Sequence, residues 1–153
     1  ETQRAAFWRL REEQPEGQRQ LGAQVKHDIS VPPSSIVEFL KIADEKCYEI
    51  MRGLRINAFG HLGDGNVHYN LSPPIGQKGF SGREKEFSVN IARLANGMKG
   101  SFAAEHGLGR SKVALADTLR HPIERQLMAR FKSALDKKNL LNPGVIVTRG
   151  GSL

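Results

Sequence analysis

The sequence contains a single cysteine, Cys47, and no long run of apolar residues. One cysteine excludes an internal disulfide and is typical of a reducing compartment, so we expect a cytoplasmic protein. No apolar run approaches the roughly 20 residues of a membrane-spanning helix. The first residues are charged and amphipathic, unlike a signal peptide. These absences predict a chain without a membrane span.

Aromatic residues are scarce at 7%, and the net charge of +7 is scattered along the chain. No basic stripe is interleaved with aromatic residues, so we do not expect nucleic-acid binding. A small anionic substrate or an acidic partner domain is equally compatible with the charge. The length of 153 residues suffices for one domain with its own core, and no linker long enough to divide the chain is visible.

The apolar pattern alternates between helical and strand spacing. One helix is expected over residues 3–13, and further helices are expected to begin near residues 35, 81 and 122. Strands are expected over residues 20–31, 54–59, 67–71 and 101–104. A hairpin in the middle of this order argues against a doubly wound parallel sheet. The pattern predicts an α+β fold, an antiparallel sheet with helices packed on one face.

The first strand and the last helix each have a predicted buried face. In the strand, alternation puts one set of residues on the buried face, Val25, His27, Ile29 and Val31, and the other set on the opposite face, Lys26, Asp28 and Ser30. In the last helix, apolar residues recur at helical spacing and are predicted to face the core: Ile123, Leu127, Phe131 and Leu135.

The stretch FGHLGDGNVHYN carries two histidines around a predicted turn. Asp-Gly favours a two-residue type I′ hairpin turn, which would set His61 directly opposite His68. Opposed Cβ atoms lie roughly 4.5–5.5 Å apart, so the two imidazoles could share one metal ion. Asn70 would project from the same face. Two alternatives stay open: an ordinary polar pair on the sheet surface, and a glycine-rich phosphate loop.

A second polar cluster, AAEHGLGR, follows the last expected strand. Glu105 beside the two histidines would complete a His₂-Glu set, which is typical of catalytic metal sites with an open position. His106 would then be left as a base. The alternative is a helix cap whose side chains face solvent.

Several motifs together resemble one known family. Four stretches, in the right order along the chain, carry the resemblance: KHDISVP, GHLGDGNVHYN, SFAAEHGLGRSK and LLNPGVI. The sequence is similar to the C-terminal substrate domain of FAD-linked oxidases in the vanillyl-alcohol oxidase superfamily. This group includes D-2-hydroxyglutarate dehydrogenase, D-lactate dehydrogenase and the glycolate oxidase FAD subunit. The resemblance runs from about Trp8 to Ile146. It implies a ferredoxin-like substrate domain, truncated here, with residues 1–153 as its C-terminal part and the FAD-binding domain outside this chain.

The resemblance also implies roles for individual residues. The implied ligands of a divalent metal, zinc or manganese, are His61, His68 and Glu105. The implied base on the substrate hydroxyl is His106. The implied substrate-binding residues are Arg11, Lys26 and Asn70. Asn142 is expected to face the flavin.

The implied activity is oxidation of a D-2-hydroxy acid to the 2-oxo acid, with hydride transfer to FAD. The expected partners are a small anionic 2-hydroxy acid and the FAD-binding domain of the same full-length protein. An apolar sheet edge left by the missing part would favour a homodimer. This chain alone is not expected to turn over. Two other functions stay open: a stand-alone metal-dependent hydrolase, and a non-catalytic module that binds metal or a partner.

Overall fold

The computed structural model describes residues 1–147. Its helices are α1 (Thr2–Arg19), α2 (Ile36–Ile50), α3 (Glu84–Gly97), α4 (Val113–Leu119) and α5 (Pro122–Leu135). Its strands are β1 (Val25–Ser30), β2 (Arg55–Phe59) and β3 (Asn66–Ser72), and short 3₁₀ turns cover Pro33–Ser35 and Leu62–Asp64. No helix in the described part of the chain is long and apolar enough to cross a membrane.

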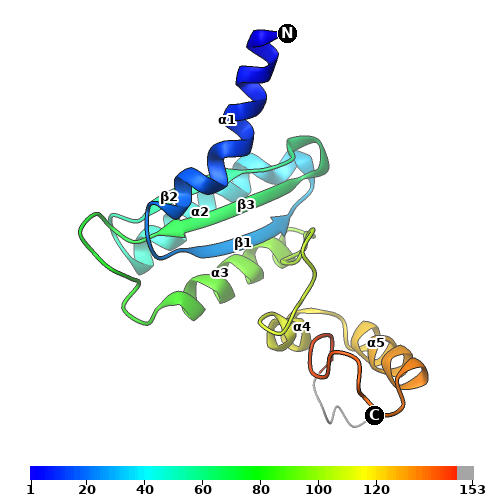
Figure 1. Ribbon diagram of the computed structural model, residues 1–153. Helices are drawn as coiled ribbons and strands as arrows, with labels where there is room; N and C mark the ends of the chain where they lie inside the picture. Colours follow the sequence, from blue (N-terminus) through cyan, green and yellow to red (C-terminus); the bar gives the residue numbers. More distant parts are fainter. Residues whose placement is uncertain (148–153) are drawn as a thin grey trace.

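The three strands form one antiparallel sheet in the order β1-β3-β2, which confirms the predicted α+β class (Figure 1). Helix α2 connects β1 to β2, and α3 follows β3, as in a split βαβ arrangement. The strand expected over residues 101–104 is wrong. Only Ser101 forms a bridge there, to Ser30 on the outer edge of β1. Beyond it the chain continues along the outer edge of β1, where Ala104 N–H donates to the Asp28 carbonyl.

One face of the sheet forms the hydrophobic core with α2 and α3. The predicted alternation along β1 is confirmed, because Val25 and Ile29 are buried on this face. Opposite them, Phe39 of α2 and Phe87 of α3 are fully buried. Each such side chain contributes about 1.5–3 kcal/mol to stability by leaving water, so this layer holds the sheet rigid beneath the polar face.

The opposite face of the sheet is polar and is crossed by the C-terminal part of α1 (Figure 1). The helix continues past Pro15 to Arg19, beyond the predicted end near residue 13. Gln18, the only buried residue of α1, accepts a hydrogen bond from Asn70 of β3 at 2.8 Å. The contacts of Gln18 with β3 and of Arg11 with Phe59 of β2 hold the helix on the sheet on both sides of Pro15.

The predicted core face of α5 is wrong. Its four apolar residues are 48–84% exposed, and no residue of α5 is buried. Figure 1 shows α5 beside α4, at a distance from the sheet. The helix still begins at Pro122, a favoured first position because proline has no N–H to leave unpaired. Helical periodicity therefore identified the helix and its apolar stripe, but not what that stripe packs against.

Candidate metal and substrate site

The loop between β2 and β3 differs from the predicted two-residue turn. His61 and Asn66 exchange both backbone hydrogen bonds, so the loop contains the four residues 62–65. Gly65 ends it in the left-handed conformation, at φ 72°. The ladder pairs His68 with Phe59 rather than with His61, a slip of two residues from the predicted register.

A slip of two residues keeps every side chain on its predicted face, because side chains alternate with period two. His61 and His68 are consequently diagonal neighbours on one face, with ring centroids 6.5 Å apart. Such diagonal pairs remain within reach of long side chains. The predicted direct opposition is therefore wrong, while the predicted proximity is correct.

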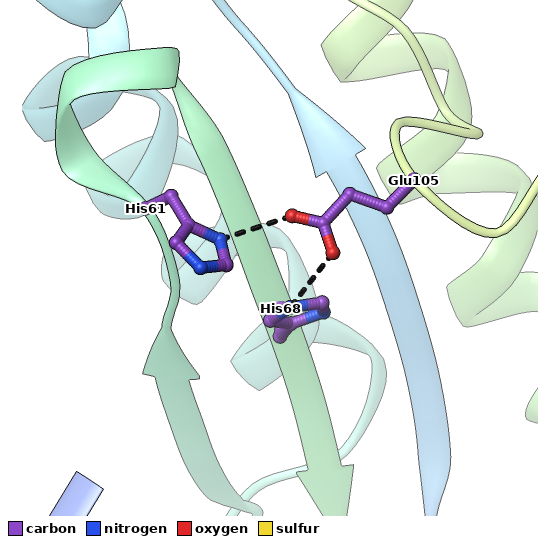
Figure 2. A group of neighbouring side chains, drawn as sticks. All are labelled: His61, His68 and Glu105. Carbon is purple, nitrogen blue, oxygen red and sulfur yellow. Dashed lines mark ion pairs between the residues drawn. The ribbon is translucent and has the colours of Figure 1, made fainter. Parts of the chain in front are cut away.

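Glu105 completes a cluster with the two histidines (Figure 2). One carboxylate oxygen lies 3.0 Å from His61 Nδ1, and the other lies 3.9 Å from His68 Nε2. Each residue offers one donor atom, and the three donors lie within 4.8 Å of one another. Imidazole nitrogens and a carboxylate are the donors that hold zinc and manganese, so the residues present fit such an ion.

The position of Glu105 depends on Asp28, a residue for which the sequence predicted no role in the site. Asp28 is buried, and its Oδ2 accepts hydrogen bonds from the backbone N–H groups of Glu105 and His106, at 2.8 and 3.0 Å. Its Oδ1 accepts from the Asn66 side chain at 2.9 Å. This carboxylate ties the loop after Ser101 to the sheet. Pairing β1 with β3 is the signal that would have revealed it, since Asp28 lies opposite His68 in that ladder.

The electrostatics keep Asp28 ionised and His68 neutral. Burial alone would raise the pKa of Asp28, but the hydrogen bonds from His106, Glu105 and Asn66 outweigh it and hold the pKa below its usual value. Burial lowers the pKa of His68, against the opposing effect of the Asp28 and Glu105 carboxylates. A neutral imidazole keeps the lone pair that a metal ligand requires.

His106 lies next to this cluster with most of its side chain exposed. Its ring is stacked on that of His68, with centroids 5.7 Å apart. Its Nδ1 lies 3.5 Å from Asp28 Oδ2. A carboxylate at this position favours the proton on Nδ1, which leaves Nε2 as the atom able to accept another proton.

A cavity of about 490 Å³ adjoins the cluster, within the size range of small-molecule sites. The predicted substrate-binding residues Arg11, Lys26 and Asn70 all line it, together with His68 and His106. The Arg11 guanidinium lies 5.7 Å from the centre of the Phe59 ring, which fixes α1 over β2. The structure thus brings together residues from α1, two strands and the loop after Ser101.

Asn142, the predicted flavin contact, lies apart from this cavity. It is exposed, in the segment after α5, with a positive φ of 47°. The cavity is also lined by three residues for which the sequence predicted no site role: Gln18, His27 and Lys112. No local motif marks them, because each depends on how distant elements pack.

Comparison with known proteins assigns the chain to one family of oxidoreductases. Residues 1–146 match the family model described as FAD linked oxidases, C-terminal domain, and the chain belongs to this family. The resemblance stated from the motifs is thereby confirmed.

Several relatives are named for one of two activities. The chain is 34% identical over 122 residues to D-lactate dehydrogenase of Archaeoglobus fulgidus, which covers 80% of this chain and 26% of that protein. It is 33% identical over 150 residues to the mitochondrial D-2-hydroxyglutarate dehydrogenase of Arabidopsis thaliana. This match covers 93% of this chain and 24% of that protein. D-2-hydroxyglutarate dehydrogenase of Stutzerimonas stutzeri is 33% identical over 123 residues, a match that covers 79% of this chain and 26% of that protein. The chain therefore spans about a quarter of the length of these curated relatives.

Proposed function

We propose that this chain supplies the substrate- and metal-binding part of a flavin-dependent oxidoreductase that converts a D-2-hydroxy acid to the 2-oxo acid. The observation that supports this most is the cavity in which Arg11, Lys26, Asn70 and His106 meet beside the His₂-Glu cluster. The relatives' named activities agree with it. FAD would be bound mainly by a separate domain of the same protein, and Asn142 is the proposed contact from this chain.

The residues of this chain would bind the substrate and take one proton. Arg11 and Lys26 would hold the carboxylate through charge-assisted hydrogen bonds, and Asn70 would orient the substrate. His106 Nε2 would accept the hydroxyl proton while Asp28 stabilises the imidazolium. A zinc or manganese ion held by His61, His68 and Glu105 would make the hydroxyl more acidic, and bound FAD would accept the hydride.

The test of the reaction uses the protein that carries this chain together with its flavin domain. We expect a yellow protein whose flavin is bleached anaerobically by a D-2-hydroxy acid. His106→Asn should lower kcat by about 10²–10⁴-fold, the usual contribution of a general base. The control is His121→Asn, because His121 lies at the start of α5, outside the cavity. A colourless protein, or an unchanged rate in His106→Asn, would contradict the proposal.

The test of the metal site is elemental analysis of protein purified without chelator. We expect about one equivalent of zinc or manganese in the wild type and in His121→Ala, and its loss in His68→Ala. Equal metal content in all three proteins would reject this ligand set. Metal-dependent cleavage of an ester or amide by this chain alone would instead favour the hydrolase hypothesis. The homodimer and the cytoplasmic location stay predictions.

A further inference from the structure

Lys112 is a half-buried cation in the wall of the cavity. Within residues 1–147, its ammonium group forms neither an ion pair nor a hydrogen bond. Lys112 is also the N-cap residue of α4, but its side chain makes no capping hydrogen bond. A positive charge at this end of a helix is unfavourable. The stability of α4 therefore does not explain why a lysine occupies this position.

The nearest negative charge is already engaged by other groups. Burial lowers the pKa of Lys112, and the Asp28 carboxylate opposes that shift. Both Asp28 oxygens, however, accept hydrogen bonds from Asn66, Glu105 and His106. A buried charge that lacks a close partner costs free energy, and an anion bound beside it would offset that cost.

Lys112 and Arg11 lie near opposite edges of the sheet and both border the cavity. Arg11 lies over Phe59 of β2, one edge strand. Lys112 follows the segment that borders β1, the other edge strand, and its charge acts on both His27 and Asp28 of β1. The central strand β3, with His68 and Asn70, lies between them.

A second unsatisfied polar group lies at the β1 side of the cavity. His27 borders the cavity, on the same face of β1 as Val25 and Ile29 and only 7% exposed, and its buried Nε2 has no hydrogen-bond partner in the described part of the chain. Its Nδ1 is engaged with the Tyr69 carbonyl, so Nε2 is left as an acceptor. A lone pair there repels an anion and attracts a donor. An anion at this end of the cavity would therefore contact Lys112 rather than His27.

We propose that Lys112 binds a second anionic group of the substrate, so that the cavity selects D-2-hydroxy acids with a second carboxylate. This inference rests on the proposed function, in which Arg11 and Lys26 hold the first carboxylate. With Lys112 the cavity lining contains three cationic side chains, and its one carboxylate is Asp28. A monocarboxylate would leave Lys112 uncompensated, whereas the second carboxylate of a diacid would neutralise it.

The experiment compares two acids of equal chain length in the flavin-containing protein. D-2-hydroxyglutarate carries a terminal carboxylate where D-2-hydroxyvalerate carries a methyl group. We expect kcat/KM to favour the diacid by about 10–100-fold, the usual effect of one charged hydrogen bond. Lys112→Met should abolish that preference by lowering kcat/KM much more for the diacid than for the monoacid. Lys112→Arg should retain most of it, and the matched control Lys41→Met, exposed on α2, should change nothing.

A second readout is equilibrium binding of 2-oxoglutarate and 2-oxovalerate to the same proteins. Diacid selectivity that disappears in Lys112→Met supports the site even if neither hydroxy acid reduces the flavin, a result that would reject the proposed function alone. Equal kcat/KM for both acids in the wild type, or equal losses for both in Lys112→Met, would overturn the Lys112 proposal. Oxidation of the monoacid would then leave the proposed function intact.

Discussion

Replacing Asp28 with asparagine tests the link between the sheet and the Glu105 segment. Asp28 accepts three hydrogen bonds, two of them from the backbone of Glu105 and His106. Asparagine has one acceptor oxygen and one NH₂ group. In one orientation its NH₂ faces the two backbone N–H groups, and in the other it faces the Asn66 amide. At least one charge-assisted bond is lost and one buried donor is left unpaired, so we expect a loss of about 2–4 kcal/mol.

The same variant should change how stability depends on pH. The folded pKa of Asp28 lies below its usual value. Its contribution to stability is therefore fully present above the unfolded pKa of about 3.9, and it is lost as the pH falls through the folded pKa. Asparagine does not titrate. The difference in stability between wild type and Asp28→Asn should be largest near neutral pH and should shrink below about pH 4.

The assay is urea denaturation of both proteins at several pH values, with Asp64→Asn as the control because Asp64 is exposed in the loop. Metal affinity, measured in parallel, should fall by about 10–100-fold because Glu105 loses its anchor. A free energy of unfolding within about 0.5 kcal/mol of wild type at pH 7 would refute the reasoning, since this is the range of surface substitutions. So would a deficit that persists undiminished in strong acid.

Two further predictions concern buried positions. Burial lowers the pKa of His27 from 6.5 to about 4 in the folded protein. As the pH falls, the unfolded chain therefore binds a proton at this histidine before the folded protein does. Stability should fall by about 3 kcal/mol between pH 6.5 and 4 from this group, and chemical denaturation of His27→Asn should lack that component; an identical slope would disprove it. Gly65 has φ 72°, and a Cβ there would lie 2.0 Å from the Val31 carbonyl oxygen, whereas Gly63 has open space. Thermal unfolding should show Gly65→Ala losing about 3 kcal/mol or more and Gly63→Ala almost nothing; equal effects would contradict the loop geometry.

The family and the polar face of the sheet could be predicted because both depend on local patterns. Alternation along β1 assigned Val25 and Asp28 to opposite faces without knowledge of any partner strand. The motifs around His61 and Glu105 each lie within a short stretch, and their order along the chain identified the family. The predicted register was wrong by two residues, but the predicted cluster was still correct, because a shift of two residues leaves each side chain on the same face of the sheet.

What could not be predicted depends on contacts between distant elements. Asp28 contacts Glu105 and His106 across 77 and 78 positions of the chain, so no spacing rule connects them. Lys112 enters the cavity only because its loop runs along β1. The apolar stripe of α5 has the same periodicity as a core helix, and periodicity does not identify what the stripe contacts.

The free edge of β1 is covered by the segment that also carries Glu105. Ser101 bonds to Ser30, and the backbone of the next residues bonds to Asp28, so this segment occupies the place of a fourth strand. An uncovered edge strand is a template for pairing with another chain. Any local opening that releases Glu105 therefore also uncovers the sheet edge. Ligands that bind Glu105 would hold this segment in place, so an occupied site would protect the protein against aggregation.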